Sequence, residues 1–484
     1  MPPAFVVLLA LLLWVPIPIA SNRLQPMALL MVSVAVLALA TAWSCRHQAH
    51  AAWARLWAVR WPLGLLAAFA LLVQIQSIAL PLAVVEVVSP MSAAAHAGGA
   101  RVLDGLAGDI ATLSVSPRDT RHAAQLALAC AVVFACAVVL TRTHTQVRWL
   151  AGALVASGCF QAVVGLSMLG SGAHVQVLDF VYSFADVHGT FANRNHMAAY
   201  LVMCLAVGMG LMLAGFEVGD GAGPRGLRAR VVAVLRFLLG RGMQLRLLLL
   251  VMVVALVLTR SRMGNASFFI ALLGAGLLGV WLWRQMAPVL LALILSLVVV
   301  DVVLIGNWVG LDRVVERMDK TALLKEDRRG EETLEERQAA SVLGLQSVLD
   351  YPWVGSGAGT FETVFTRYRS PGIDGRYQHA HNDYLEIASD TGLLGLGLLL
   401  GVVVATAARA LCVLRAERSR LARGMAFASL MAMTAMAVHA GVDFNLQIPA
   451  VVLSFCVVLA LAWVADALPM RRRASAHGSE RYLK

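Results

Sequence analysis

The sequence is poor in charged residues. Asp, Glu, Lys and Arg make up 14% of its 484 residues, whereas hydrophobic residues make up 60% and the mean hydropathy is +0.76. A soluble domain carries about 25% charged residues, so this composition excludes a soluble protein of ordinary make-up. It predicts an integral membrane protein.

Cysteine pairs and internal repeats are also missing. The seven cysteines lie within or beside apolar segments. None lies in the long polar stretch at 309–387, and no two are spaced as Cys-x-x-Cys. This distribution excludes a disulfide framework and a cysteine-based metal site. No repeat is visible, which disfavours a solenoid, and the two halves lack the similarity typical of transporters with inverted repeats.

Twelve apolar segments predict an all-α polytopic membrane protein. Most approach the roughly 20 residues that a helix needs to cross about 30 Å of hydrocarbon. The first has no basic residues before it and no small-residue cleavage site, so we interpret it as a helix rather than a signal peptide. The predicted spans are 4–20, 24–43, 61–80, 122–140, 147–169, 197–217, 246–259, 265–283, 287–308, 388–408, 422–441 and 448–467.

These spans divide the chain into four regions, and the basic residues predict their orientation. Residues 1–308 hold nine spans, 309–387 form one large loop, 388–468 hold three spans, and 469–484 form a basic tail. With a cytoplasmic N-terminus, 22 of the 39 Lys and Arg residues fall on the cytoplasmic side and seven in short outer loops. Both termini and the tail are therefore predicted to be cytoplasmic and the large loop periplasmic. We interpret the net charge of +11 as this bias plus affinity for anionic lipid, not for nucleic acid.

Arginines on the predicted outer side are candidates for binding an anion. Arg260 and Arg262 lie in a connection of about five residues between two spans. Arginine at that depth is costly unless it is paired, and its guanidinium suits phosphate oxygens. Alternatively, one of the two reaches lipid headgroups or pairs with a loop carboxylate. Arg194 and Asn195 precede another span, where Asn195 could equally cap the helix.

The large loop contains an expected helix and a glycine-rich turn. Acidic residues at 331–336 are typical of a first helical turn, and the helix should stop before Pro352. The turn at 355–361 lacks the Lys-Ser/Thr of a phosphate-binding P-loop. We interpret it as a tight turn near the membrane.

The end of this loop holds alternating polar residues with three open interpretations. His379, His381 and Asp383 would share one face of an extended segment, where two histidines and a carboxylate could ligate a metal. A histidine there could instead accept a proton near neutral pH. Finally, His381 and Asn382 could tie the loop to the next helix.

Five segments, taken in order, resemble the O-antigen ligase and polymerase superfamily. The most characteristic is HAHNDYLE at 379–386, followed by GLLG at 392–395. The others are GTFANRNH at 189–196, SR at 261–262, GSGAGTF at 355–361 and DFNLQIP at 443–449. The resemblance covers about residues 185–465, whereas the first 180 residues are similar only in being apolar.

The resemblance implies a GT-C-like glycosyltransferase at the periplasmic face of the bacterial inner membrane. Its glycan donor would be linked to undecaprenyl diphosphate, and no nucleotide sugar, cofactor or obligatory metal would be needed. The family's essential histidine before Asn falls on His381, its membrane-proximal arginine on Arg262 and its loop arginine on Arg337. The residues then expected to bind substrate are Arg194, Arg260, His379, Asn382 and Asn195.

The residues suit this chemistry, but they leave the acceptor open. A diphosphate leaving group needs cations on its oxygens, and an acceptor hydroxyl needs a base. The acceptor could be a glycan, lipid A-core or a protein hydroxyl, the last defining a protein O-oligosaccharyltransferase. A polysaccharide flippase is an alternative of another class, for which Asp301 in the ninth span would be the signal.

Overall fold

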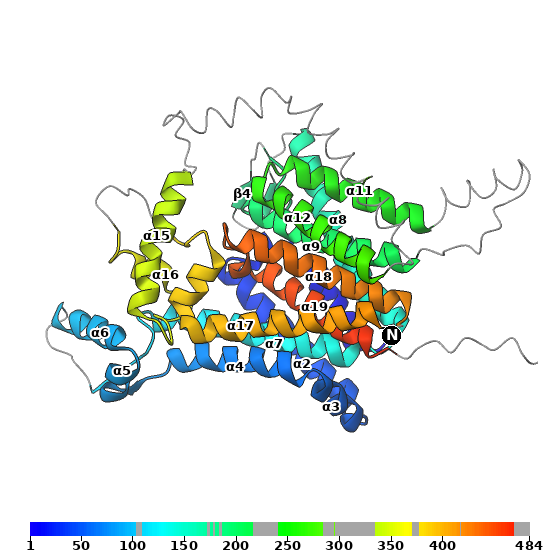
Figure 1. Ribbon diagram of the computed structural model, residues 1–484. Helices are drawn as coiled ribbons and strands as arrows, with labels where there is room; N and C mark the ends of the chain where they lie inside the picture. The colour runs from blue at the N-terminus through cyan, green and yellow to red at the C-terminus, as the bar shows by residue number, and fades with distance from the viewer. Residues whose placement is uncertain are drawn as a thin grey trace, which may run out of the picture.

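The computed structural model describes a bundle of long apolar helices (Figure 1). It covers residues 1–102, 109–171, 175–177, 180–182, 186–215, 241–283, 295, 334–369, 377–416 and 418–468. Eight described helices are long and apolar enough to cross a membrane, or nine if a bent pair counts as one span. The eight are α2 (Leu24–Cys45), α7 (Pro117–Leu140), α8 (His144–Ser171), α9 (Arg194–Gly215), α12 (Arg262–Leu282), α17 (Asp383–Arg415), α18 (Arg420–Ala440) and α19 (Pro449–Asp466).

The remaining apolar helices are shorter. The bent pair is α3 (Ala49–Ala58) and α4 (Arg60–Gln76), which meet at 85°. The others are α1 (Pro3–Trp14) and α11 (Arg241–Leu258). Every predicted span thus coincides with a helix except 287–308, of which residue 295 alone is described, while Asp301 lies outside the described residues. The prediction of an all-α, multi-pass membrane protein is confirmed.

Helix α9 forms the centre of the bundle. Of its most apolar window, 94% is buried, against 22% for α17 and 28% for α2. Gly210 of α9 faces Gly424 of α18 so closely that a Cβ on Gly210 would lie 2.3 Å from the Gly424 carbonyl oxygen. Small residues allow such backbone contact between membrane helices. The outer helices α2 and α17 leave most of their apolar side chains for lipid.

Short elements gather at one end of the bundle, which we call the outer end (Figure 1). They include α5 (Leu82–Val88), α6 (Pro90–Val102), α15 (Leu334–Asp350) and α16 (Phe361–Phe365). Two antiparallel ladders pair β1 (Leu80–Pro81) with β2 (Ile110–Ala111) and β3 (Val175–Val177) with β4 (Phe180–Tyr182). The 3-10 turns are η1 (Ile19–Ser21) and η3 (Asn445–Gln447). The N-terminus and α3 lie at the opposite end.

Helix α17 is broken near its outer end. Gly392 has φ +69°, and a Cβ there would lie 2.2 Å from the Trp353 carbonyl. The chain from Pro352 fills the break, since the Leu393 N–H donates to the Pro352 carbonyl over 2.8 Å and the Gly357 N–H to the Asp390 carbonyl over 2.9 Å. The predicted tight turn is therefore present, and it divides α17 into a short outer helix and a long apolar span.

Candidate functional site

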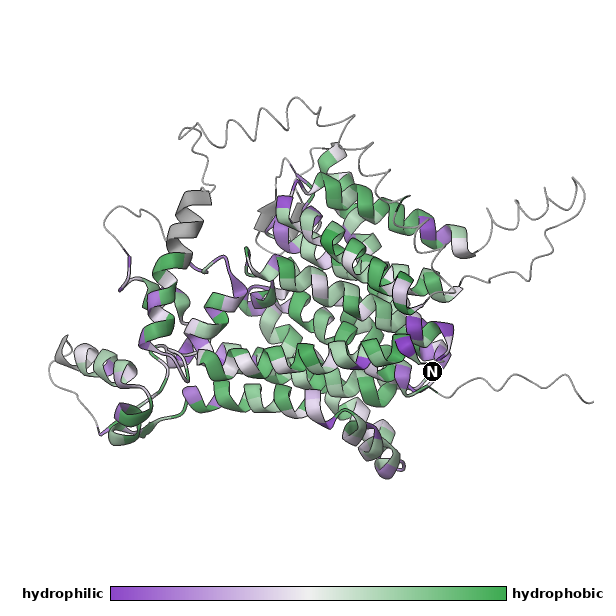
Figure 2. Cartoon of the chain, viewed as in Figure 1, coloured by the Kyte–Doolittle hydropathy of each residue, from purple (hydrophilic) through white to green (hydrophobic). Residues whose placement is uncertain are grey.

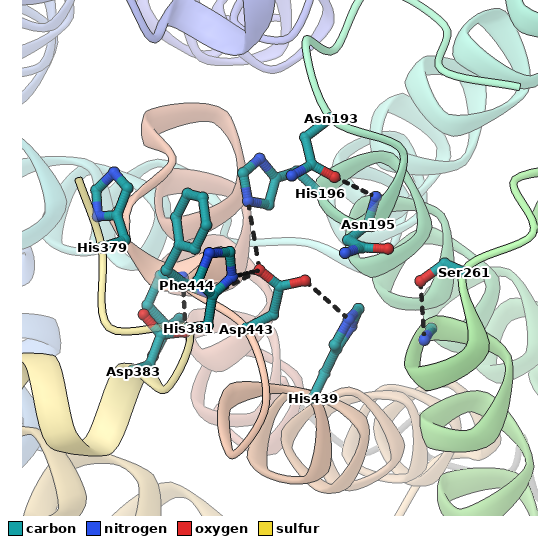
Figure 3. Close-up of polar contacts among 12 residues, drawn as sticks. Asn193, Asn195, His196, Ser261, His379, His381, Asp383, His439, Asp443 and Phe444 are labelled. Atoms are coloured by element: carbon teal, nitrogen blue, oxygen red, sulfur yellow. Dashed lines mark hydrogen bonds and ion pairs between the residues drawn. The ribbon is translucent and has the colours of Figure 1, made fainter. Parts of the chain in front are cut away.

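Polar side chains meet where four segments reach the outer end of the bundle. These are the starts of α9, α12 and α17 and the connection between α18 and α19. Hydrophilic residues lie among the apolar helices where the chain enters α17 (Figure 2). Several predicted site residues are brought together here from distant parts of the sequence (Figure 3).

His381 has an unusual backbone conformation. Its φ is +50°, one of five positive values among described non-glycine residues. Such conformations cost about 1–3 kcal/mol and are frequent at functional sites. The Nδ1 atom of the mostly buried His381 ring lies 3.9 Å from Oδ1 of Asp443. The strained backbone thus places an imidazole 3.9 Å from a carboxylate, which is longer than a hydrogen bond but close enough for electrostatic attraction.

Asp443 is the centre of this cluster, and sequence reasoning gave it no role. Its side chain is 2% exposed. Besides His381, Nε2 of His196 lies 3.9 Å from Oδ1, and Nε2 of His439 lies 4.0 Å from Oδ2. The Phe444 N–H donates to Oδ1 over 2.9 Å. A signal was present in the sequence, because Asp443 begins the family-like segment 443–449 and His439 precedes it by four residues.

The cluster includes buried polar atoms that have no hydrogen-bond partner among the described residues. They comprise Nε2 of His196, both ring nitrogens of His439 and both amide atoms of the Asn445 side chain. Each such group costs about 1–3 kcal/mol. A membrane helix bundle would gain stability from apolar residues at these places. Their presence favours a functional interpretation of the cluster.

His379 has a different partner from His381. Its Nδ1 lies 2.7 Å from Oε1 of the buried Glu386, and the Ala380 N–H donates to Oε2 over 2.8 Å. Its ring stacks on Phe444 with centroids 4.0 Å apart. Burial lowers the pKa of His379, but the Glu386 carboxylate outweighs burial, so that the pKa is raised overall. This histidine is therefore suited to carry positive charge rather than to act as a base.

Two residues expected near the substrate lie at helix starts. The Asn382 side chain accepts the Leu385 N–H over 3.1 Å and caps α17. Asn382 thus ties the loop to the next helix, as the structural interpretation predicts. Asn195 donates its backbone N–H to the Asn193 side chain over 2.8 Å, so Asn193 rather than Asn195 caps the start of α9. The Asn195 side chain is half-buried.

The outer arginines differ in their pairing. Asp186 contacts Arg194 over 2.5 Å and Arg260 over 3.1 Å, which matches the alternative of a loop carboxylate. Arg260 has φ +53°. Arg262 begins α12 directly after its cap Ser261, and its side chain is exposed without an ion pair to any described residue. Arg262 therefore keeps its guanidinium open to an anion.

Burial keeps His188 neutral beside these arginines. Burial lowers the pKa of His188 to about 4, Asp186 opposes this shift and Arg194 reinforces it.

Arg337 lies in the first turn of α15, and its side chain lies outside the described part of the structure. That helix ends at Asp350, before Pro352, as predicted.

The glycine-rich turn has a structural role and is not part of the polar cluster. Its N–H groups are used inside the protein, since Gly359 donates to the Asp390 carboxylate over 2.7 Å and Ala358 to the Gln76 side chain over 3.1 Å. Positive φ at Gly355, with a Cβ position 2.2 Å from the Asp390 carbonyl, requires glycine there. The turn holds the short outer part of α17 against α4.

The described residues do not support the metal interpretation of the alternating histidines. His379 binds Glu386, whereas Asp383 accepts the Leu446 N–H over 3.0 Å and His381 faces Asp443. The three side chains therefore have separate partners. No group of three His, Cys, Asp or Glu side chains in the described ranges has an arrangement that could hold a metal ion.

Fold and site together define a multi-pass membrane protein with a buried histidine–carboxylate cluster and an open arginine at one end. The family model described as O-antigen ligase matches residues 247–400. Over these residues the match confirms the resemblance to the O-antigen ligase and polymerase superfamily. The match includes Arg260, Arg262, Arg337 and His381 but not His196 or Asp443. No curated protein matches the chain.

Proposed function

We propose that this protein transfers or polymerises undecaprenyl-diphosphate-linked O-antigen or a related surface polysaccharide. The observation that carries the proposal is the His381 imidazole, held by a strained backbone 3.9 Å from the buried Asp443 carboxylate at the same end of the bundle as Arg262. An O-antigen ligase type of activity, supported by the family match, needs a base and a cation of this kind.

In this mechanism the acceptor hydroxyl oxygen attacks the anomeric carbon of the donor glycan. The bond from that carbon to the phosphate oxygen breaks, and its electron pair leaves with undecaprenyl diphosphate. His381 takes the hydroxyl proton, and Asp443 stabilises the imidazolium that forms. Arg262 and Arg337 neutralise the diphosphate, for which bidentate guanidinium contacts are suited.

The remaining residues hold this arrangement together. Arg194 and Arg260, joined through Asp186, provide positive charge next to the diphosphate position. His379, whose pKa is raised although burial opposes the shift, adds charge beside Phe444. Asn195 contacts the donor glycan. Asn382 acts by capping α17 in the orientation that His381 requires.

The site faces the periplasm of a bacterial inner membrane in this proposal, with both termini cytoplasmic. The orientation rests on the basic residues of the predicted cytoplasmic side, which include Arg409 and Arg418, paired with Asp466 at the opposite end of the bundle. Thr366→Cys should react with a membrane-impermeant maleimide in intact spheroplasts, and His47→Cys should not. The reverse pattern would place the site in the cytoplasm.

The acceptor distinguishes the candidate activities. A glycan acceptor defines a polymerase, lipid A-core a ligase and a protein hydroxyl an O-oligosaccharyltransferase. A flippase would bind the same carrier without breaking the bond from sugar to phosphate. Release of undecaprenyl diphosphate from a purified donor in nanodiscs therefore separates the transferases from the flippase.

The decisive variant is His381→Ala. We expect it to abolish glycan transfer while donor binding and thermal unfolding stay close to the wild type, because the base acts only in the chemical step. His379→Ala should be milder. The matched control is His50→Ala in α3, an exposed histidine at the opposite end. Full transfer by His381→Ala would refute the assignment of the base.

A further inference from the structure

An exposed apolar stripe lies along one face of α15. Val342, Leu345 and Leu349 are spaced by three and four residues and are 69%, 51% and 72% exposed. Trp353 follows one turn later and is also exposed. A stripe of this size on a polar loop indicates an interaction surface.

The opposite face of α15 is already used within the protein. The Ser347 hydroxyl lies 2.5 Å from the Ser389 hydroxyl of α17. Gly344 is buried so closely that a Cβ there would lie 3.0 Å from Leu385 and 3.2 Å from Phe361. These contacts fix one face of α15 on the outer part of α17. The stripe, on the other face, therefore points away from the bundle.

The stripe continues the lipid-facing surface of α17. At the helix break, the Leu394 N–H donates to the Trp353 carbonyl over 3.3 Å, and both Leu393 and Leu394 have exposed side chains. Farther along α17, Val404 is exposed as well. Exposed apolar side chains thus extend from the membrane span through Trp353 to α15.

The length of α17 places the stripe at a membrane boundary. From Leu393 to Arg415 the helix rises about 33 Å at 1.5 Å per residue, close to the thickness of about 30 Å of a hydrocarbon core. Trp353 lies at the outer end of this length, and tryptophan is enriched at membrane interfaces. Helix α15 runs across the end of α17 rather than along it (Figure 1), as a helix lying in the membrane surface would.

The opposite end of the bundle shows the same arrangement. Helix α3 bends 85° away from α4 and buries none of its residues. It exposes Trp53 and Trp57, whose rings stack with centroids 6.3 Å apart. Helices α15 and α3 thus lie at opposite ends of the bundle (Figure 1).

We infer that α15 is a membrane-surface helix whose stripe of Val342, Leu345, Leu349 and Trp353 inserts into the outer leaflet of the bilayer. The partner is the lipid surface itself, in the manner of amphipathic interfacial helices. One consequence rests on the proposed function. The anchored helix keeps its first turn, which includes Arg337, near the depth at which the diphosphate of a lipid-linked donor lies.

The test is a depth measurement on the whole protein in nanodiscs. Cys412 is the one exposed cysteine, and the other six are buried, so a Cys412→Ser background allows a single added thiol to carry an environment-sensitive fluorophore. Leu349→Cys reports on the stripe. Thr366→Cys is the aqueous control, and Val404→Cys is the control in lipid. Quenching is measured with aqueous iodide and with lipids that carry a nitroxide near the headgroup.

We expect the label at position 349 to be quenched at least about threefold more by nitroxide lipid than the label at 366, and correspondingly less by iodide, as for an interfacial helix. Iodide quenching equal to that at 366 would overturn the inference, because the stripe would then face water. Protection from both quenchers would also overturn it and would indicate a protein on this face. Neither readout depends on glycan transfer, so loss of the proposed activity and loss of membrane contact are distinguished.

Discussion

Replacement of Asp443 by asparagine should slow glycan transfer by about 1,000-fold. The carboxylate lies 3.9 Å from Nδ1 of His381 and is 2% exposed. At an effective dielectric constant of about 20, unit charges at that separation attract by about 4 kcal/mol. Each 1.36 kcal/mol corresponds to about tenfold in rate. The imidazolium formed as His381 takes the acceptor proton would lose this stabilisation, whereas asparagine keeps the shape of the side chain.

The assay is single-turnover transfer from a purified lipid-linked glycan in nanodiscs, with donor binding and thermal unfolding measured in parallel. Asp466→Asn is the matched control, since Asp466 is also a buried carboxylate but pairs with Arg409 and Arg418 at the opposite end. It should reduce stability and leave turnover unchanged.

A double variant separates an effect through His381 from a general loss of structure. Groups that act as one unit have non-additive effects. Asp443→Asn should therefore add little in a His381→Ala background. Turnover by Asp443→Asn within about fivefold of the wild type would refute the Coulombic argument. An additive loss in the double variant would show that Asp443 acts independently of His381.

Three further outcomes follow from the contacts around the site. Arg262→Lys should be nearly as harmful as Arg262→Ala, about 100- to 1,000-fold in turnover, because lysine cannot grip phosphate oxygens bidentately; activity close to wild type in Arg262→Lys would contradict this. Since Glu386 raises the pKa of His379 against the effect of burial, the wild type should be stabilised below the ordinary value of 6.5 and lose that stabilisation as pH rises through the raised pKa. Glu386→Gln should remove this pH dependence from thermal unfolding. Gly392→Ala should lower the unfolding temperature strongly, because the added Cβ would lie 2.2 Å from the Trp353 carbonyl, whereas Gly397→Ala, with no neighbour within 4 Å, should not.

Local sequence patterns predicted most helices because membrane spans depend on local composition. Runs of apolar residues must form helices to satisfy their backbone in lipid. The helix before Pro352 ended where predicted for a similarly local reason, since the residue before proline avoids the helical region. The first span was predicted to reach residue 20, but α1 ends at Trp14. Pro16 and Pro18 lie within the predicted span and cannot continue a helix.

The elements that sequence reasoning missed depend on long-range contacts. The break in α17 exists because the chain from Pro352 to Gly359 enters it, and no local pattern records that insertion. Asp186 was missed because its partners Arg194 and Arg260 belong to different spans. Asp443 lies in a family-like segment, but its contact with His381 is made only in the folded bundle.

The folded bundle also explains why the recognised segments occur where they do. The segments at 189–196, 261–262, 379–386 and 443–449 each run into the start of a helix, namely α9, α12, α17 and α19. Helix N-termini carry partial positive charge and backbone N–H groups without a partner inside the helix. Four of them lie at the outer end with Arg262, and although Asn193, Ser261 and Asn382 cap three of them, their partial charges still favour an anion there. Under the proposed function, that anion is the donor diphosphate. The helix N-termini then stabilise its negative charge together with the arginine side chains.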